Sequence, residues 1–537
     1  MAEYSQPTKI RARSLALSHA VELLTTRREH AAVVPKDYVA RVKKTLSERK
    51  ETFDSYAAAN ADEHFISDWE AFWFSKVGSK VPSDLTVAYL AGPEPLNDFR
   101  ELVKLGVHPH NIFGFESETK EFNRALANAK SSEFPLLKII KMPLDRYLQA
   151  VPMSFDIIYF DACGPFPSPN QRTLRTVATI FRYQRLNPLS VLITNFAGPD
   201  QTNTTLTHAF ADLVSCYLYP RAFQESEDPD WNMEDGPVAQ GLVPKEPGGG
   251  DSFYDIVLKD LPRFYGNFIT RQLFDLGSFI VPLARLASGG STSLWNTFFA
   301  KSAEELAKLA IDRKTFDVDG NGGDYIVDPD MNAMGWTFSA LLDPNDTEDY
   351  PTIDPRSRAL LQTWARELGG SPEVKAREAI DAYLLLKNLR EADWLRPTMQ
   401  ELLIGYRYLQ NMHMFCDVPT HELALFPVAA QFSYPYHYNV QETQRYRYVA
   451  EGKSTDMYLD VIPFDTCRYL YDWLPSTELV SESFDLVGHQ LVYRFALDAL
   501  LKHSIRYNNE YVFGGHVVGV NEEGYSEHLL KPRQVIL

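Results

Sequence analysis

The sequence predicts an α/β fold with a mostly parallel sheet, preceded by helices and followed by a large, mainly α-helical C-terminal region. Two observations indicate the sheet. Between residues 85 and 200, short apolar runs alternate with stretches of helical pattern, and such alternation is typical of parallel strands joined by helices. The runs are also almost wholly apolar, as strands covered on both faces by helices must be.

Residues 1–80 are expected to form an N-terminal helical segment before the first strand. The stretches 16–30 and 39–53 are rich in Ala, Leu, Glu, Lys and Arg at helical spacing. An aromatic cluster follows at Trp69, Phe72, Trp73 and Phe74. These side chains fit either a packed core or a lid over a cleft, and core packing is the commoner fate of such a cluster.

Residues 81–205 are expected to form the sheet domain, with five strands and three helices in alternation. The strands are expected at 86–92, 111–116, 136–141, 155–161 and 189–196. The helices are expected at 95–106, 118–130 and 171–186. Pro95 and Asn97 favour the start of the first helix, and Gly106 favours its end.

Two further segments complete the expected organisation. Residues 206–250 include acids, prolines and a run of three glycines, which is typical of an exposed connection. Residues 251–537 are expected to be mainly helical. Helical signals there include stretches at 302–311, 371–392 and 492–506.

The charge of the chain argues against a general nucleic-acid or membrane binder. The formal net charge is −18, and such an acidic field discourages non-specific adhesion to nucleic acid or anionic lipid. Lys43–Lys50 and Arg445–Arg447 are local basic stretches. Each fits a basic groove or, more commonly, a solvated face.

Cysteine spacing and hydropathy point to a soluble cytoplasmic protein. The four cysteines lie far apart with no C-x-x-C pair, so we expect reduced, mostly buried thiols and no zinc or redox site. No stretch approaches the roughly 20 apolar residues that span a bilayer, and the N-terminus lacks an apolar signal core.

The ends of the expected strands carry the most informative side chains. In open α/β sheets, ligands bind beyond the carboxyl ends of the strands, near the switch point. The first strand ends at Gly92, which would let the backbone approach a ligand before a helix begins. Glu116 ends the second strand, 24 positions later, and an acid at that spacing suits the ribose hydroxyls of an adenosine-containing cofactor.

This order of elements resembles the class I, Rossmann-like S-adenosylmethionine-dependent methyltransferase superfamily over residues 85–200. The resemblance implies that Gly92 is the glycine of motif I, Glu116 the ribose ligand of motif II and Asp161 the acid of motif IV. Asp145 would be a partner for the adenine edge. It also implies S-adenosylmethionine as cofactor and methyl transfer as reaction, with Asp161 orienting an acceptor that the sequence does not name, protein or nucleic acid being the most plausible classes.

The same strand ends also depart from the family pattern. Ala91, Pro93 and Glu94 surround Gly92 where the family usually has further glycines, and Ala162 follows Asp161. The departures favour a second hypothesis, a non-catalytic subunit that keeps the fold and holds a protein partner, or associates with itself, through the C-terminal region.

Each site residue also has a plain structural interpretation. The glycine would then serve only a tight turn, the glutamate would face solvent and Asp161 would cap a helix or turn. A nicotinamide site is disfavoured because no G-x-G-x-x-G follows the first strand.

Three motifs outside the sheet domain remain open. Residues 317–328 have the spacing of a calcium loop, but a β-hairpin with a Gly-rich turn explains them better. His413 and Cys416 have helical spacing without a second ligand pair, so core packing is favoured over a metal site. The aromatic stretch 432–438 and the nearby Arg445–Tyr448 could stack bases, or could form an interface between domains or subunits, which we favour.

Overall fold

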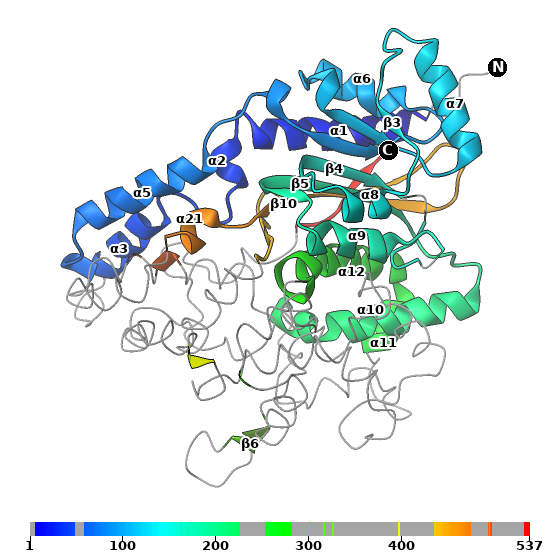
Figure 1. Ribbon diagram of the computed structural model, residues 1–537. Helices are drawn as coiled ribbons and strands as arrows, with labels where there is room; N and C mark the ends of the chain where they lie inside the picture. The colour runs from blue at the N-terminus through cyan, green and yellow to red at the C-terminus, as the bar shows by residue number, and fades with distance from the viewer. Residues whose placement is uncertain are drawn as a thin grey trace, which may run out of the picture.

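The structure is a computed structural model that describes residues 6–48, 58–162, 164–168, 170–225, 253–281, 434–473 and 531–537, with a few single residues and pairs elsewhere. In these ranges, one nine-stranded sheet lies between two layers of helices (Figure 1). The α/β class with a mostly parallel sheet is therefore confirmed.

Five parallel strands form the first part of the sheet. They are β1 (Val87–Leu90), β2 (Ile112–Phe115), β3 (Ile139–Ile140), β4 (Phe155–Asp161) and β5 (Leu186–Ala197). Their order is β3-β2-β1-β4-β5, so the chain adds strands on one side of β1 and then on the other. The switch point between β1 and β4 is the place where doubly wound sheets bind ligands.

The helices that connect these strands cover both faces of the sheet. They are α6 (Leu96–Lys104), α7 (Thr119–Lys130), α8 (Leu144–Ala150) and α9 (Thr173–Arg182), with 3₁₀ turns η1 (Pro82–Asp84) and η2 (Pro109–Asn111) before the first two strands. Helix α8 was not predicted, because seven residues are too few for a helical period to be recognised. Figure 1 shows α6 above the sheet and α9 below it.

The C-terminal part of the chain completes the same sheet. It contributes β8 (His437–Tyr438), β9 (Gln444–Val449), β10 (Asp456–Asp465) and β11 (Gln534–Ile536). Strand β10 pairs antiparallel with β5 and with β9, and β11 pairs parallel with β9. The region expected to be mainly helical therefore also supplies four strands to the sheet, and α21 (Arg468–Tyr471) is the helix with given bounds among the described residues after 433.

A proline lies inside β10 without breaking the sheet. Pro463 is opposite Val191 of β5. On its other side, β9 pairs with β10 only as far as Val461, and β8 begins its pairing at Phe464. The missing N–H of Pro463 therefore lies where β10 changes partners, a position at which a strand tolerates proline.

A second helical group follows β5. It comprises α10 (Thr204–Glu225), α11 (Phe253–Lys259), α12 (Leu261–Asp275) and the π-helical turn η5 (Leu276–Ile280). Residues 206–225 were expected in an exposed connection, but they continue α10 and bury Phe210 and Leu213. The charged, proline-rich composition begins only near Glu225, so the boundary was set too early; residues 226–250 lie outside the described ranges.

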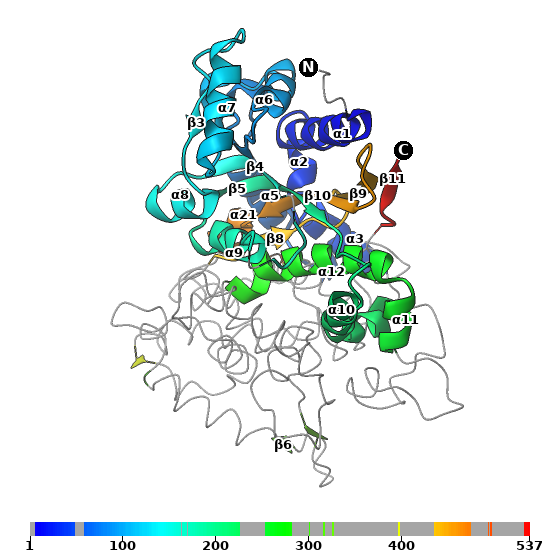
Figure 2. The same ribbon diagram turned by 90° about the vertical axis from the view of Figure 1, so that its right-hand side faces the viewer.

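The N-terminal helices are α1 (Pro7–Leu24), α2 (Arg28–Ala31), α3 (Tyr38–Glu48) and α5 (Glu63–Val77). Helix α1 packs directly against β5, β9 and β10, and Figure 2 shows it beside β9 and β11. Its buried face carries Ala12, Ala16 and Ala20, whose small side chains let the helix approach the strands closely. Helix α1 is therefore a layer of the sheet domain.

The aromatic cluster of α5 is mostly core. Trp69 and Trp73 are fully buried, and the indole nitrogen of Trp73 donates to the carbonyl oxygen of Val34 at 2.9 Å. Phe74 is 50% exposed. The core interpretation therefore holds for the two tryptophans.

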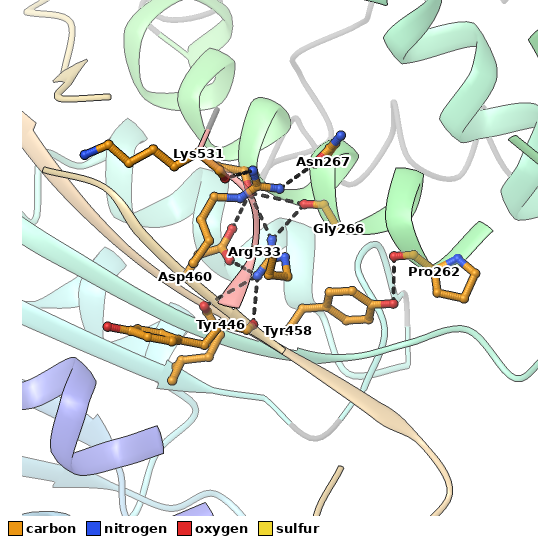
Figure 3. Close-up of polar contacts among 11 residues, drawn as sticks. Pro262, Gly266, Asn267, Tyr446, Tyr458, Asp460, Lys531 and Arg533 are labelled. Atoms are coloured by element: carbon orange, nitrogen blue, oxygen red, sulfur yellow. Dashed lines mark hydrogen bonds and ion pairs between the residues drawn. The ribbon is translucent and has the colours of Figure 1, made fainter. Parts of the chain in front are cut away.

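Arg533, which directly precedes β11, connects this strand to β10 and α12 (Figure 3). Its guanidinium donates to Asp460 of β10, to the carbonyl oxygen of Gly266 at 2.8 Å and to Thr270 Oγ1 at 3.1 Å. The second oxygen of Asp460 accepts from Thr270 Oγ1 at 2.6 Å. One buried ion pair thus joins β10, β11 and α12. No helix among the described residues is long and apolar enough to cross a membrane.

Candidate functional site

A cleft of about 720 Å³ opens at the carboxyl ends of the parallel strands. Its walls come from the segments that follow β1, β2, β3 and β4 and from the first turns of α1. All four residues expected at a cofactor site line this one cleft: Gly92, Glu116, Asp145 and Asp161. The volume lies in the range of small-molecule sites, roughly 300–1,000 Å³.

The turn after β1 leaves open space beside its glycine. Gly92 has a φ of +53°, and a Cβ added there would meet no atom within 4 Å. The turn is held from behind, since Tyr89 Oη donates to the carbonyl oxygen of Pro95 and Asn128 Nδ2 donates to that of Pro93, both at 2.9 Å. A left-handed residue favours glycine, so this position has a backbone reason to be glycine whether or not a ligand binds.

Glu116 places one carboxylate oxygen at the cleft. Its Oε1 accepts a hydrogen bond from the backbone N–H of Glu118 at 2.8 Å, which fixes the side chain at the end of β2. The side chain is half-buried, and its Oε2 makes no hydrogen bond with the described residues. A donor in the cleft can therefore reach that oxygen.

Asp145 is a buried acid on the first turn of α8, only 2% exposed. Its Oδ2 accepts no hydrogen bond among the described residues. Two cations are near it, since Arg175 Nε lies at 3.5 Å and Arg172 Nη1 at 3.8 Å. The arginines balance the charge of Asp145 but leave the hydrogen-bonding capacity of Oδ2 unused, which is uncommon for a buried polar atom.

Asp161, at the end of β4, has partners on both oxygens. Oδ1 accepts from Asn195 Nδ2 and Oδ2 pairs with Lys9 Nζ, at 2.8 Å and 2.9 Å. Asn195 also donates to Tyr448 Oη at 2.8 Å. Burial raises the pKa of Tyr448 to about 12, so that hydroxyl stays neutral. Asp161 caps no helix, because the next helix, α9, begins at Thr173 after Arg172.

Helix α1 brings two cations into the cleft, Lys9 and Arg13, which were not predicted as site residues. Lys9 and Arg13 both line it, and Arg13 forms an ion pair with buried Asp98 on α6. Burial raises the pKa of Asp98, and the attraction of Arg13 lowers it in part. Lys9 and Arg13 are four residues apart, so their shared helix face was visible in the sequence, but the surface that this face meets was not.

In the loop after Asp161, Gly164 leaves space for the side chain of Gln171. A Cβ at Gly164 would lie 1.2 Å from Gln171 Oε1, so only glycine lets Gln171 lie across this loop. The loop is tied to α12, because the backbone N–H of Phe166 donates to Tyr265 Oη at 2.6 Å. Of these residues, Gln171 lines the cleft.

The calcium and metal motifs lie mostly outside the described residues. Strands β6 (Thr315–Phe316) and β7 (Tyr325–Ile326) pair antiparallel, in agreement with the hairpin interpretation. The loop between them lies outside the described residues, as do His413, Cys416 and the helices expected at 302–311 and 371–392. Within the described part of the chain, no three His, Cys, Asp or Glu side chains are grouped as metal ligands.

The tyrosines near β9 and Arg445 are packed inside the fold. The buried tyrosines are Tyr436, Tyr438, Tyr446 and Tyr448. Arg445 donates to Asn267 Oδ1 and to the carbonyl oxygen of Lys531. Arg447 is 39% exposed and pairs with Asp456. The tyrosines therefore offer no surface for stacking bases, and they lie in the core of one sheet rather than between domains or subunits.

Comparisons with known proteins give no relative from which a function could be transferred. No protein-family model matches the chain, and no curated protein or solved structure matches it either. The geometry of the cleft is therefore the ground for assigning a function.

Proposed function

We propose that this protein binds S-adenosylmethionine in the cleft and transfers its methyl group to an acceptor. The observation that carries the proposal is the convergence of Gly92, Glu116, Asp145 and Asp161, from four separate strand ends, on one cleft. The strand order also supports it. The order β3-β2-β1-β4-β5 places the switch point between β1 and β4, at this cleft, where doubly wound sheets bind their ligands.

The donor set of the cleft fits an adenosine-containing cofactor. Asp145 lines the cleft and is the acid assigned to the amino group of adenine; its Oδ2 is buried beside Arg172 and Arg175, so binding there requires these side chains to shift. Glu116 Oε2 suits the ribose hydroxyls. The open side of the Gly92 turn leaves room for the amino-acid end of the molecule.

In this proposal the protein binds and orients the reactants. The cofactor supplies a methyl group already activated by its sulfonium, so alignment can provide most of the rate enhancement. Asp161 holds the donor group of the acceptor, and Asn195 keeps the carboxylate in place through the 2.8 Å hydrogen bond.

A second candidate function is binding without transfer. It is favoured by Asp161, whose two oxygens already have protein partners, and by Glu94, an exposed acid in the wall of the cleft. A methyltransferase-fold subunit that binds the cofactor or a partner protein, without reacting, would have these properties.

Calorimetry tests the binding step. Titration with S-adenosylmethionine and S-adenosylhomocysteine should give saturable heat, and Glu116→Ala and Asp145→Asn should each weaken binding at least tenfold. Glu121→Ala is the matched control, because Glu121 lies on α7, outside the cleft lining. A folded wild-type protein that shows no binding at millimolar ligand would reject the proposal.

Transfer is tested separately with labelled methyl donor. Incubation with extract of the native source, followed by protease or nuclease digestion, would show whether the label enters protein or nucleic acid. Cofactor binding without any labelled product would favour the non-catalytic candidate.

A further inference from the structure

The turn after β1 is poorly equipped to hold a carboxylate. Pro93 has no N–H to donate, and Glu94 adds a negative charge to the wall of the cleft. S-adenosylmethionine carries a carboxylate at its amino-acid end. A binding group for that carboxylate must therefore come from another element.

Three cations line the cleft: Lys9, Arg13 and Arg172. Arg172 lies beside Asp145, the residue assigned to adenine, whereas Lys9 and Arg13 of helix α1 pair with Asp161 and Asp98 and differ in availability. The side chain of Arg13 is 10% exposed and its Nε is bonded to buried Asp98. Removing Arg13 from that pair would leave a buried carboxylate uncompensated, which is strongly unfavourable. The side chain of Lys9 is 26% exposed, and its partner Asp161 is 12% exposed. Lys9 is thus the cation that can exchange its partner at lower cost.

We propose that Lys9 recognises the carboxylate of the bound cofactor and exchanges Asp161 for it. This inference rests on the proposed function. The exchange keeps the ammonium of Lys9 paired throughout. It also frees Oδ2 of Asp161 for the acceptor, while Asn195 continues to hold Oδ1. Lys9 therefore keeps Asp161 engaged until a carboxylate ligand is present.

The helix itself need not move for this exchange. The backbone N–H and hydroxyl of Thr8 both donate to Glu451, at 2.7 Å and 2.6 Å, which ties the first turn of α1 to the turn between β9 and β10. The flexible four-carbon stem of a lysine is enough to redirect its ammonium. Rotation of one side chain thus couples ligand binding to the release of Asp161.

The test uses two ligands that differ only in the carboxylate. Binding of S-adenosylhomocysteine and of its decarboxylated analogue, S-adenosyl-3-thiopropylamine, is measured by calorimetry on the full chain. Wild type should bind the carboxylate form at least tenfold more tightly, because a charge-assisted hydrogen bond is lost in the analogue. Lys9→Met should weaken S-adenosylhomocysteine about tenfold or more and leave the analogue unchanged, so that the variant no longer distinguishes the two ligands.

Two further variants sharpen the result. Lys9→Arg keeps a cation and should retain most of the preference for the carboxylate. Lys104→Met is the matched control, since Lys104 is a 75% exposed lysine on α6 outside the cleft lining, and it should behave like wild type. Purely structural damage in Lys9→Met would weaken both ligands equally and would overturn the inference.

The outcomes separate this inference from the proposed function. Wild type that binds both ligands, together with Lys9→Met that still prefers the carboxylate form as strongly, rejects the role of Lys9 alone. Wild type that binds neither ligand rejects the cofactor site, and the role of Lys9 with it.

Discussion

Gly92 combines a left-handed backbone with an open surrounding, and the two properties can be tested apart. Because a Cβ would meet no atom, Gly92→Ala should cost only the strain of a positive φ, about 1–2 kcal/mol of unfolding free energy. The added methyl group would also enter the cleft. We therefore expect Gly92→Ala to lose stability, measured by urea unfolding, and to weaken S-adenosylhomocysteine binding in addition.

Gly78 is a matched control for this substitution. It has a φ of +59° and likewise no atom within 4 Å of an added Cβ, but it ends α5 and lies away from the cleft. Gly78→Ala should also lose stability, because its φ is likewise positive, and should keep full ligand affinity. Equal affinities in the two variants would show that the Gly92 turn does not contact the ligand.

His437 gives the folded protein a specific sensitivity to acid. Burial lowers its pKa from 6.5 to about 3, so the folded protein excludes a proton that the unfolded chain accepts. Above pH 6.5 the histidine is neutral in both states and does not lower the unfolding free energy. As the pH falls from 6.5 towards 3, only the unfolded chain takes up the proton, so the unfolding free energy decreases. Between pH 7 and pH 5 this single group should lower the unfolding free energy by about 2 kcal/mol.

The pH effect is isolated by comparison with a variant that cannot titrate. His437→Gln retains a polar group opposite Tyr471 Oη, which lies 2.7 Å from the imidazole Nε2. Urea unfolding at pH 7 and pH 5 should show the smaller loss in the variant. Identical losses in both proteins would mean that His437 is protonated in the folded state.

At the scale of elements, the parallel half of the sheet was predictable and the antiparallel half was not. Strand β4 has seven residues, of which the first six are buried and the last is the acid Asp161, and its bounds were predicted correctly. Strand β10 contains Asp460, Pro463 and Asp465, and these residues interrupt an otherwise apolar run. Their partners lie far away in the sequence, as Arg533 does for Asp460.

The same distinction applies to the cleft. Gly92, Glu116 and Asp161 could be grouped from the sequence because parallel strands bring their carboxyl ends to one edge. Asn195, which donates to Asp161, lies near the carboxyl end of the expected strand 189–196 and could have been grouped by the same rule. Lys9, the ion-pair partner of Asp161, could not, because nothing local in the sequence shows that α1 crosses to that edge. Periodicity within an element is visible in a sequence, whereas the packing partner of an exposed face is not.

The Arg533–Asp460 pair should be the most sensitive link between β11 and the sheet. The two side chains are 9% and 0% exposed, so removing the arginine leaves a buried carboxylate without its counter-charge. We expect Arg533→Met to lower the unfolding free energy by about 3 kcal/mol or more. The double variant Arg533→Met, Asp460→Leu should recover part of the loss, because it removes both charges.

An exposed ion pair serves as the comparison for this prediction. Arg100 and Glu133 form a pair with side chains that are 54% and 53% exposed. Arg100→Met should change the unfolding free energy by at most about 1 kcal/mol. A similarly small effect for Arg533→Met would show that β11 contributes little to the stability of the sheet.

For the molecule as a whole, stability should be graded from the centre of the sheet outwards. Strands β4 and β5 are buried along nearly their whole length, whereas α7 buries only Ala125 and Ala129. Amide hydrogen exchange should therefore be slowest in β4 and β5 and clearly faster in α7. Equal protection of the two regions would mean that the sheet and its outer helices open together as one unit.

The pairing of β5 with β10 also implies a delay between the synthesis of these two neighbouring strands. Strand β10 begins about 260 residues after β5 ends, which at about 5–20 residues per second means that β5 waits roughly 13–50 seconds on the ribosome for this neighbour. During that interval the edge of β5 exposes unpaired backbone N–H and C=O groups, to which a strand of another nascent chain could pair. Translation speed and chaperone supply, more than the final stability of the fold, should therefore govern the yield of this protein in a cell.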